Sequence, residues 1–217
     1  MRQTNKIRKG IAWLLCTVLV LGILPMLPQM SMQISAAENA ASVFVDGVEL
    51  HAGGKKYFKN GDTADSGATG TDEDHSAYYD TAGELWLNNL EAHTIKANGN
   101  LTIYVCNNQE TNTNIVTATQ NETAIEVTGY LTIQYGGYGE TGSLTVESDG
   151  KEAIQAGSGM TVSDGVEVKV RAKSGATAIS SGGVLKIDGI RTKLEAASDG
   201  STGKGIFAQQ SIYVKNS

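Results

Sequence analysis

Ala124-Ile125-Glu126-Val127-Thr128-Gly129-Tyr130-Leu131-Thr132-Ile133 is the stretch that decides the fold, because its pattern recurs along the chain. Related stretches begin at Ile95, Ile154, Ile179 and Ile206, and in each a second apolar pair starts six residues after the first Ile. The leading isoleucines lie 30, 29, 25 and 27 residues apart. The six-residue spacing within each copy is constant, whereas the spacing between copies varies. This combination predicts that each copy is one coil of a solenoid and that loops of different length account for the varying distance between copies.

Each coil is expected to supply three short strands. The first begins at the leading Ile, the second is the Leu-x-Ile pair after a glycine-containing corner, and the third follows a further loop. The third-strand pairs are Ile115 with Thr117, Leu144 with Val146, Val168 with Val170, and Leu194 with Ala196. Apolar residues alternate with polar ones throughout, so each strand should bury one face, whereas no window sustains a helical period. Coils stacked about 4.8 Å apart should place equivalent residues in one interior column. For the second strand that column is Leu131, Met160, Leu185 and Ile212.

The region before the coils predicts a cap. Residues 43–50 form two apolar runs about Asp46-Gly47, which is typical of a tight hairpin, and an uncovered first coil would expose its core. Residues 60–76 are rich in Gly, Asp, Ser and Thr and are expected to form a loop. The repeats are expected to start at Tyr78-Tyr79, because Tyr79 precedes Leu85 by six residues. The expected domains are therefore 38–76, capping hairpin and acidic loop, and 77–217, solenoid.

The first 37 residues have the layout of a secretory signal peptide. A basic end precedes an apolar run from Ile11 to Leu27, and the small residues Ser35-Ala36-Ala37 provide a cleavage site before Glu38. An uncleaved membrane anchor is the alternative. Removing this leader, with its four basic and no acidic residues, changes the net charge from −6 to −10. That charge argues against nucleic acid and anionic membranes as partners and fits a secreted bacterial protein.

Cysteine content and the end of the chain add two expectations. Cys16 lies in the leader, so Cys106 cannot form an intrachain disulfide, and stability must come from the core, a metal or both. The sequence stops within the second strand of a coil, at residues 212–217. A missing C-terminal segment, or else a partner that covers the last coil, is therefore expected.

With the repeats established, residues 43–217 resemble the secreted β-helix carbohydrate-binding proteins of clostridia and related Firmicutes. The matching residues are Val45-Asp46-Gly47, Tyr79-Asp80 followed by Leu85-Trp86-Leu87-Asn88-Asn89, and the two strands Gly99-Asn100-Leu101-Thr102-Ile103 and Gly129-Tyr130-Leu131-Thr132-Ile133. The resemblance implies an all-β, right-handed, single-stranded parallel β-helix. It also implies calcium and binding of plant cell-wall polysaccharides such as cellulose or pectin.

The outward face of the second strands is the predicted carbohydrate site. If Leu85, Leu87 and Leu101 point inward, then Trp86 and Tyr104 point to solvent on neighbouring coils. An exposed aromatic ring offers the C–H face of a pyranose a surface to stack on, and nearby polar groups meet its hydroxyls. The alternative is that both rings pack beneath the acidic loop or the cap. The remaining predicted contacts are Asn88, Thr102, Gln134 and Tyr213.

The acidic loop is the predicted calcium site. Calcium takes six to eight oxygen ligands, which a flexible acidic loop can bring together, although the spacing here does not follow the EF-hand pattern. A solvated loop without metal is the alternative interpretation. The candidate ligands are Asp62, Asp65, Asp72 and Asp74.

No catalytic residues are predicted. His51, His75 and His93 lack metal-ligand spacing, and the loop at residues 200–205 has Gly205 where a phosphate loop needs Ser or Thr. The sequence therefore predicts a secreted, non-catalytic protein that binds extended polysaccharide, with display on a bacterial surface as a further expectation. The alternatives are a structural adhesin or stalk and, less favoured, a pectate-lyase-like enzyme.

Overall fold

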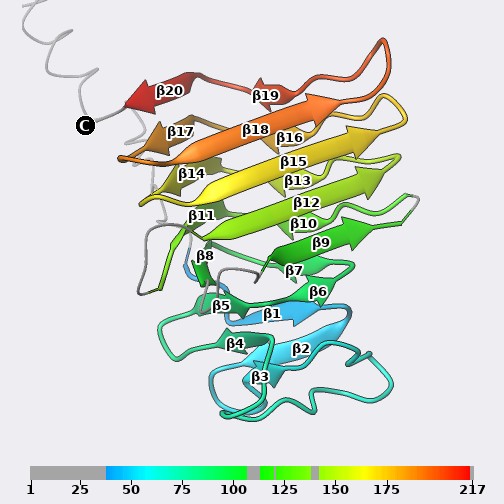
Figure 1. Ribbon diagram of the computed structural model, residues 1–217, viewed down its shortest axis with the longest axis vertical. Coiled ribbons are helices and arrows are strands. Elements are labelled where there is room, and N and C mark those ends of the chain that lie inside the picture. Colours follow the sequence, from blue (N-terminus) through cyan, green and yellow to red (C-terminus); the bar gives the residue numbers. More distant parts are fainter. Residues whose placement is uncertain (1–37, 107–112, 120, 138–141, 216–217) are drawn as a thin grey trace, which may run out of the picture. The chain divides into compact units, whose positions relative to one another are not determined.

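The computed structural model describes residues 38–106, 113–119, 121–137 and 142–215 of the 217-residue chain. The predicted signal peptide, residues 1–37, lies outside the described residues. The described part is all-β, and its strands form three sheets in which successive coils add parallel strands (Figure 1). The predicted parallel β-solenoid with three strands per coil is confirmed.

The strands of each sheet follow in spatial order. The first sheet contains β2 (Val48–His51), β1 (Ser42–Val45), β7 (Ile95–Ala97), β10 (Ile125–Val127), β13 (Ile154–Ala156), β16 (Ile179–Ser181) and β19 (Ile206–Ala208). The second contains β3 (Tyr57–Phe58), β4 (Ala77–Tyr79), β5 (Glu84–Asn88), β8 (Leu101–Cys106), β11 (Tyr130–Tyr135), β14 (Gly159–Ser163), β17 (Leu185–Asp188) and β20 (Ile212–Lys215). The third contains β6 (Glu91–Ala92), β9 (Asn114–Ala118), β12 (Ser143–Asp149), β15 (Glu167–Lys173) and β18 (Lys193–Ser198).

The predicted interior column exists. Leu131 pairs with Met160, Met160 with Leu185, and Leu185 with Ile212. The first three are fully buried, whereas Ile212 on the last strand is 51% exposed. The leading isoleucines form an equivalent column in the first sheet. These columns fill the centre of the solenoid, and each fully buried side chain contributes about 1.5–3 kcal/mol.

Glycine is required where consecutive coils approach most closely, at the corner between the first and second sheets. A Cβ on Gly182 would lie 1.8 Å from the carbonyl oxygen of Gly157, and a Cβ on Gly157 would lie 2.2 Å from that of Thr128. Neither distance is compatible with a side chain. Consecutive coils can therefore stack this closely at the corner only because Gly157 and Gly182 have no side chain.

The predicted hairpin caps the first coil. β1 and β2 pair antiparallel about Asp46 and Gly47, both of which have positive φ, as a two-residue hairpin turn of this type requires. β1 then pairs antiparallel with β7 and covers its free edge. One carboxylate oxygen of Asp46 accepts hydrogen bonds from the backbone N–H groups of His93 at 2.6 Å and Thr94 at 2.8 Å. The turn residue thereby holds the cap against the corner before β7.

The start of the repeats was predicted wrongly. β4, which contains Tyr78 and Tyr79, runs antiparallel to β5, and the short β3 pairs antiparallel with β4. The six-residue step from Tyr79 to Leu85 is therefore the span of a hairpin and not of a coil. The first strand of the parallel stack in this sheet is β5, which pairs with β8.

In β9, the third strand of its coil, the inward-pointing residues differ by one position from the predicted pair Ile115 and Thr117. Asn114 and Val116 pair with Leu144 and Val146, so they point inward, and Ile115 points outward. Asn114 is fully buried in a position that leucine or valine occupies in later coils. Its Oδ1 accepts a hydrogen bond from the backbone N–H of Leu90 at 3.0 Å, and its Nδ2 donates to two backbone carbonyls. These three hydrogen bonds compensate for the removal of the Asn114 amide from water, as is usual for buried polar groups.

Candidate functional site

A row of aromatic side chains crosses the outer face of the second sheet. Tyr57 pairs with Tyr78, Tyr78 with Trp86, Trp86 with Tyr104, and Tyr104 with Gln134. All five side chains are half-buried, while their neighbours along each strand are mostly buried in the core. We call these five residues the aromatic row. The outward orientation predicted for Trp86, Tyr104 and Gln134 is the one observed, and parallel stacking brings the three together.

The rings of the aromatic row stack on each other in two pairs. The ring centroids of Trp86 and Tyr104 lie 4.1 Å apart at an interplanar angle of 11°, and those of Tyr57 and Tyr78 lie 5.0 Å apart at 20°. A Cβ on Gly136 would lie 2.9 Å from the Trp86 ring, so this glycine packs against the first pair. One face of Trp86 is therefore covered by its neighbour. The rings point outward as predicted, and in addition each stacked pair covers one face of each of its rings.

Two carboxylates flank the Trp86–Tyr104 pair. The indole Nε1 of Trp86 donates to Asp80 at 3.4 Å, and the Tyr104 hydroxyl donates to Glu84 at 3.4 Å. Asp80 is held in place because its other oxygen accepts the backbone N–H groups of Ala82 and Glu84, both at 2.9 Å. Burial, followed by the negative charge of Asp80, raises the pKa of the Glu84 carboxyl. Burial and the charge of Glu84 likewise raise the pKa of Tyr104.

The other predicted sugar contacts lie beside the row or far from it. Thr102 belongs to the neighbouring outward row, in which Thr102, Thr132 and Thr161 pair in succession. Asn88 lies on the other side, at the end of β5, two residues after Trp86. Tyr213 is 54% exposed on β20, four strands beyond β8, which corresponds to about 19 Å. The structure therefore does not bring Tyr213 together with Trp86.

Sequence reasoning missed two members of the row. Tyr78 was assigned to the repeats without a surface role, and Tyr57 was not considered. Tyr78 lies between buried Ala77 and Tyr79, so strand alternation could have shown that it points outward. Tyr57 belongs to a strand of two residues, too short for a period to be read. The Tyr57 hydroxyl donates to Asp72 at 3.1 Å, which links the row to the acidic loop.

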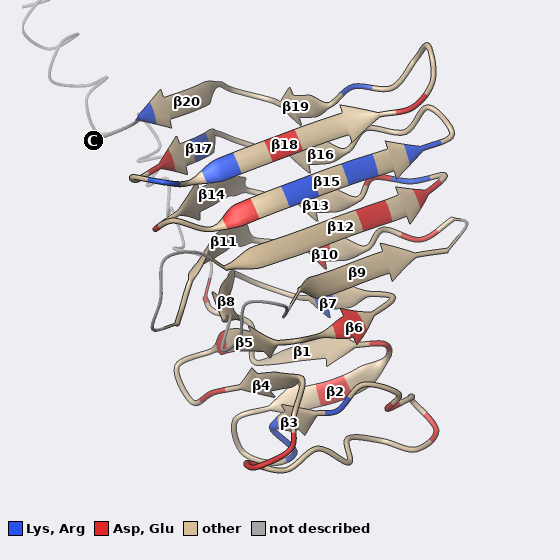
Figure 2. Cartoon of the chain, viewed as in Figure 1, with Lys and Arg blue, Asp and Glu red and all other residues tan. Residues whose placement is uncertain are grey.

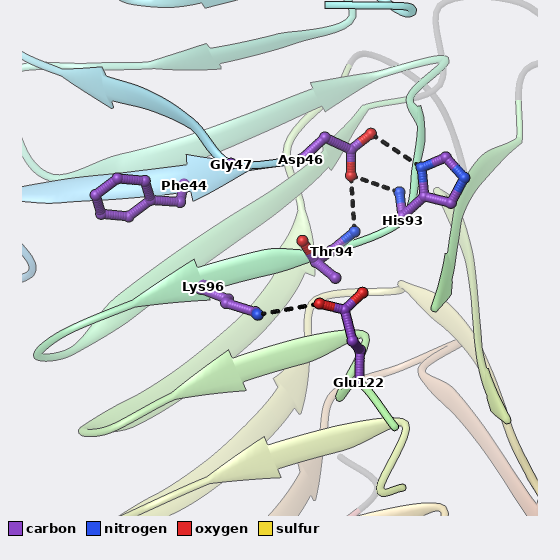
Figure 3. A pocket seen from close by; sticks show the side chains of 7 residues that line it. All are labelled: Phe44, Asp46, Gly47, His93, Thr94, Lys96 and Glu122. Carbon is purple, nitrogen blue, oxygen red and sulfur yellow. Dashed lines mark hydrogen bonds and ion pairs between the residues drawn. The ribbon is translucent and has the colours of Figure 1, made fainter. Parts of the chain in front are cut away.

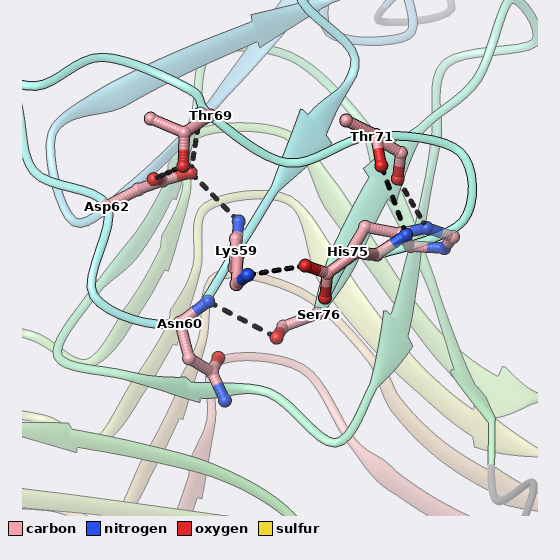
Figure 4. Close-up of polar contacts among 8 residues, drawn as sticks. Lys59, Asn60, Asp62, Thr69, Thr71, His75 and Ser76 are labelled. Atoms are coloured by element: carbon pink, nitrogen blue, oxygen red, sulfur yellow. Dashed lines mark hydrogen bonds and ion pairs between the residues drawn. The ribbon is translucent and has the colours of Figure 1, made fainter.

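Asp62 organises the acidic loop (Figure 4). It is buried, and its carboxylate accepts hydrogen bonds from the backbone N–H groups of Lys59 and Thr69, both at 2.9 Å, and from the Thr69 hydroxyl. Burial alone would raise the pKa of this carboxyl, but these hydrogen bonds outweigh burial and lower it. Because three N–H and O–H donors already occupy its oxygens, Asp62 acts as a loop anchor.

The remaining predicted calcium ligands have separate positions. Asp74 forms an ion pair with Lys59, Asp72 accepts the Tyr57 hydroxyl, and Asp65 is exposed. Within the described ranges, no three His, Cys, Asp or Glu side chains are grouped closely enough to hold a metal ion. Calcium binding by this loop stays a prediction.

A recess of about 410 Å³ lies on the outer face of the first sheet (Figure 3). Its charged groups are engaged with each other: Asp46 binds the backbone and the ring of His93, and Lys96 lies 3.7 Å from Glu122. Phe44 forms one wall and is 40% exposed. The charged groups of this recess are therefore paired with each other or with the backbone.

A scan against protein-family models and searches of curated proteins and of solved structures find no match to this chain. The resemblance to clostridial carbohydrate-binding proteins therefore stays a prediction. Across the residues that the structure describes, no helix is long and apolar enough to cross a membrane.

Proposed function

We propose that this protein is a secreted, non-catalytic carbohydrate-binding β-solenoid that holds extended polysaccharide against the outer face of its second sheet. The observation that supports this most strongly is the aromatic row, in which four rings and an amide lie in register on five adjacent strands. Neighbouring strands are about 4.8 Å apart, so the row repeats at intervals comparable with the length of one sugar unit. A polymer lying along the stack would meet a similar surface at each step.

The stacked pairs suggest how sugars would be held. The half-buried rings of Tyr57, Tyr78 and Trp86 provide apolar contact. The phenol oxygens, which can still accept hydrogen bonds, and the carboxylates beside them provide acceptors for sugar hydroxyls. The adjoining row of Thr102, Thr132 and Thr161 supplies hydroxyls at the same spacing. The stacking also fixes the ring orientations before a ligand arrives, which lowers the entropy lost on binding.

Calcium is retained in the proposal as an aid to the loop beside the row. Asp72 and Asp74 are exposed carboxylates close to Tyr57 and Lys59, and Asp65 is exposed in the same loop. Asp62 does not belong to this set because its oxygens are engaged. Adding a chelator to a binding assay tests this part separately.

The experiment is retention of the full chain on insoluble cellulose and on insoluble xylan. Trp86→Ala and Tyr104→Ala should each weaken retention about tenfold, since buried aromatic contacts dominate binding energy. Phe207→Ala is the matched control, because Phe207 is an outward aromatic on the first sheet that is 39% exposed. Thermal unfolding of each variant shows that loss of retention is not loss of folding.

Other outcomes favour the other functions. Wild-type protein that folds but is retained on no polysaccharide contradicts the proposal and favours a structural stalk or adhesin. Release of unsaturated products from pectate, followed by ultraviolet absorbance, would instead demonstrate a lyase.

A further inference from the structure

The strands at the centre of the second sheet carry no charge on their outer face. β8, β11 and β14 contain no Asp, Glu, Lys or Arg (Figure 2). The third sheet is the opposite case. On its outer face β12 carries acidic residues and β15 mainly basic ones. Lys173 on β15 pairs with Glu147 on β12 at 3.2 Å, and Arg171 on β15 pairs with Asp199, which follows β18, at 2.8 Å. The two outer surfaces are thus distinct in charge as well as in aromatic content.

The charged side chains that form hydrogen bonds with the aromatic row are negative. Asp80 contacts the Trp86 indole, Glu84 contacts the Tyr104 hydroxyl, and Asp72 accepts the Tyr57 hydroxyl. None of these three carboxylates forms an ion pair with a residue in the described part of the chain, unlike Asp74, which pairs with Lys59. Lysines on this sheet lie toward its two ends: Lys56 and Lys59 come directly before and after β3, two strands from β5, and Lys186 on β17 is three strands beyond β8, or about 14 Å.

We infer that this surface selects uncharged polysaccharide and excludes polyuronates, with Asp80 and Glu84 as the specificity-determining residues. The inference rests on the proposed function and names its ligand class. A carboxylate has about four acceptor sites, so Glu84, which accepts the Tyr104 hydroxyl, and Oδ2 of Asp80, which accepts the Trp86 indole, can each still accept a sugar hydroxyl. A uronate in the same place puts its own carboxylate beside two like charges, next to aromatic rings that exclude water and strengthen the repulsion. Rejection of an unwanted ligand by like charge is a common source of specificity.

Glu84→Gln is the most informative variant. The amide retains an oxygen that can accept the Tyr104 hydroxyl, and the change removes one negative charge. Glu195→Gln is the matched control, since Glu195 is an exposed carboxylate on β18 of the third sheet. Both variants alter net charge equally, so any difference between them reports the place of the charge and not its amount.

The experiment measures binding of the full chain to a neutral polymer, hydroxyethyl cellulose, and to polygalacturonate of similar length by affinity electrophoresis. Wild-type protein should be retarded by the neutral polymer and not by polygalacturonate. Glu84→Gln should raise the ratio of polygalacturonate to neutral binding about fivefold at low ionic strength, and molar salt should reduce this effect. Glu195→Gln should leave the ratio unchanged.

The possible failures are distinguishable. Wild-type binding to both polymers with similar affinity, with or without calcium, overturns the inference and leaves the proposed function standing. An unchanged ratio in Glu84→Gln also overturns it. Binding to neither polymer overturns the inference together with the proposed function.

Discussion

Replacing Asn114 by leucine should destabilise the protein, although leucine is what the repeat pattern favours at this position. The change leaves the buried N–H of Leu90 without its acceptor, which costs about 2 kcal/mol, and removes two weaker bonds to the carbonyls of Cys106 and Ser143, about 1 kcal/mol each. Burial of the leucine side chain offsets about 2 kcal/mol. The net expectation is a loss of about 2 kcal/mol in the free energy of unfolding.

Urea unfolding of Asn114→Leu, followed by far-ultraviolet circular dichroism, measures this loss. Ile115→Thr is the control, because Ile115 lies on the same strand but points outward, and it should cost less than about 1 kcal/mol. A leucine variant as stable as the wild type would refute the reasoning, since it would mean that apolar stacking outweighs the three hydrogen bonds. A large loss for Ile115→Thr would instead show that the strand faces the other way.

Three further perturbations test the stacking and the loop. Met160→Ala should cost about 2–5 kcal/mol in urea unfolding, whereas Ile212→Ala, in the same column but half exposed, should cost under about 1 kcal/mol; equal losses would contradict the column. Gly182→Ala should lower the melting temperature more than any surface substitution, because its Cβ would meet a carbonyl oxygen at 1.8 Å, and an unchanged melting temperature would contradict the close approach. For Asp62 the folded pKa lies below the unfolded value, so its stabilisation is present above the ordinary Asp pKa and is lost as the pH falls through the folded pKa. Melting temperatures measured against pH should therefore fall less steeply in acid for Asp62→Asn than for the wild type, and parallel curves would contradict this assignment.

The repeat pattern was sufficient to predict the architecture. A step of six residues between two apolar pairs is a local property, and stacking turns it into columns such as Leu131, Met160 and Leu185. The Asp46-Gly47 turn was equally readable, because few residue pairs adopt positive φ at two successive positions. In each of these cases the residues that determine the structure lie close together in the sequence.

The predictions were wrong where contacts between residues far apart in the sequence determine the phase or the direction of a strand. Ile115 fits an inward strand position by composition, but Asn114 finds partners on Leu90, Cys106 and Ser143, and this fixes the opposite phase. The step from Tyr79 to Leu85 matches the repeat by spacing alone, and only strand direction shows that it is a hairpin.

The candidate site was predicted in part for the same reason. Alternation along β5 and β8 gives the outward direction of Trp86 and Tyr104, but it contains no information on ring orientation. Whether two outward rings lie flat on a sheet or stack on each other depends on side-chain torsions and on neighbours such as Gly136. Likewise, composition marks Asp62 as a potential metal ligand, and only its contacts with Lys59 and Thr69 show that it holds the loop.

Fluorescence of Trp86 is the measurement that tests the central claim most directly. The chain has two tryptophans, so in a Trp13→Phe background all tryptophan emission comes from the aromatic row. Titration with a soluble neutral oligosaccharide should change this emission saturably, and Tyr104→Ala should abolish the change. Oligosaccharide binding detected by calorimetry without any change in Trp86 emission would contradict the account, because the ligand would then lie elsewhere on the protein.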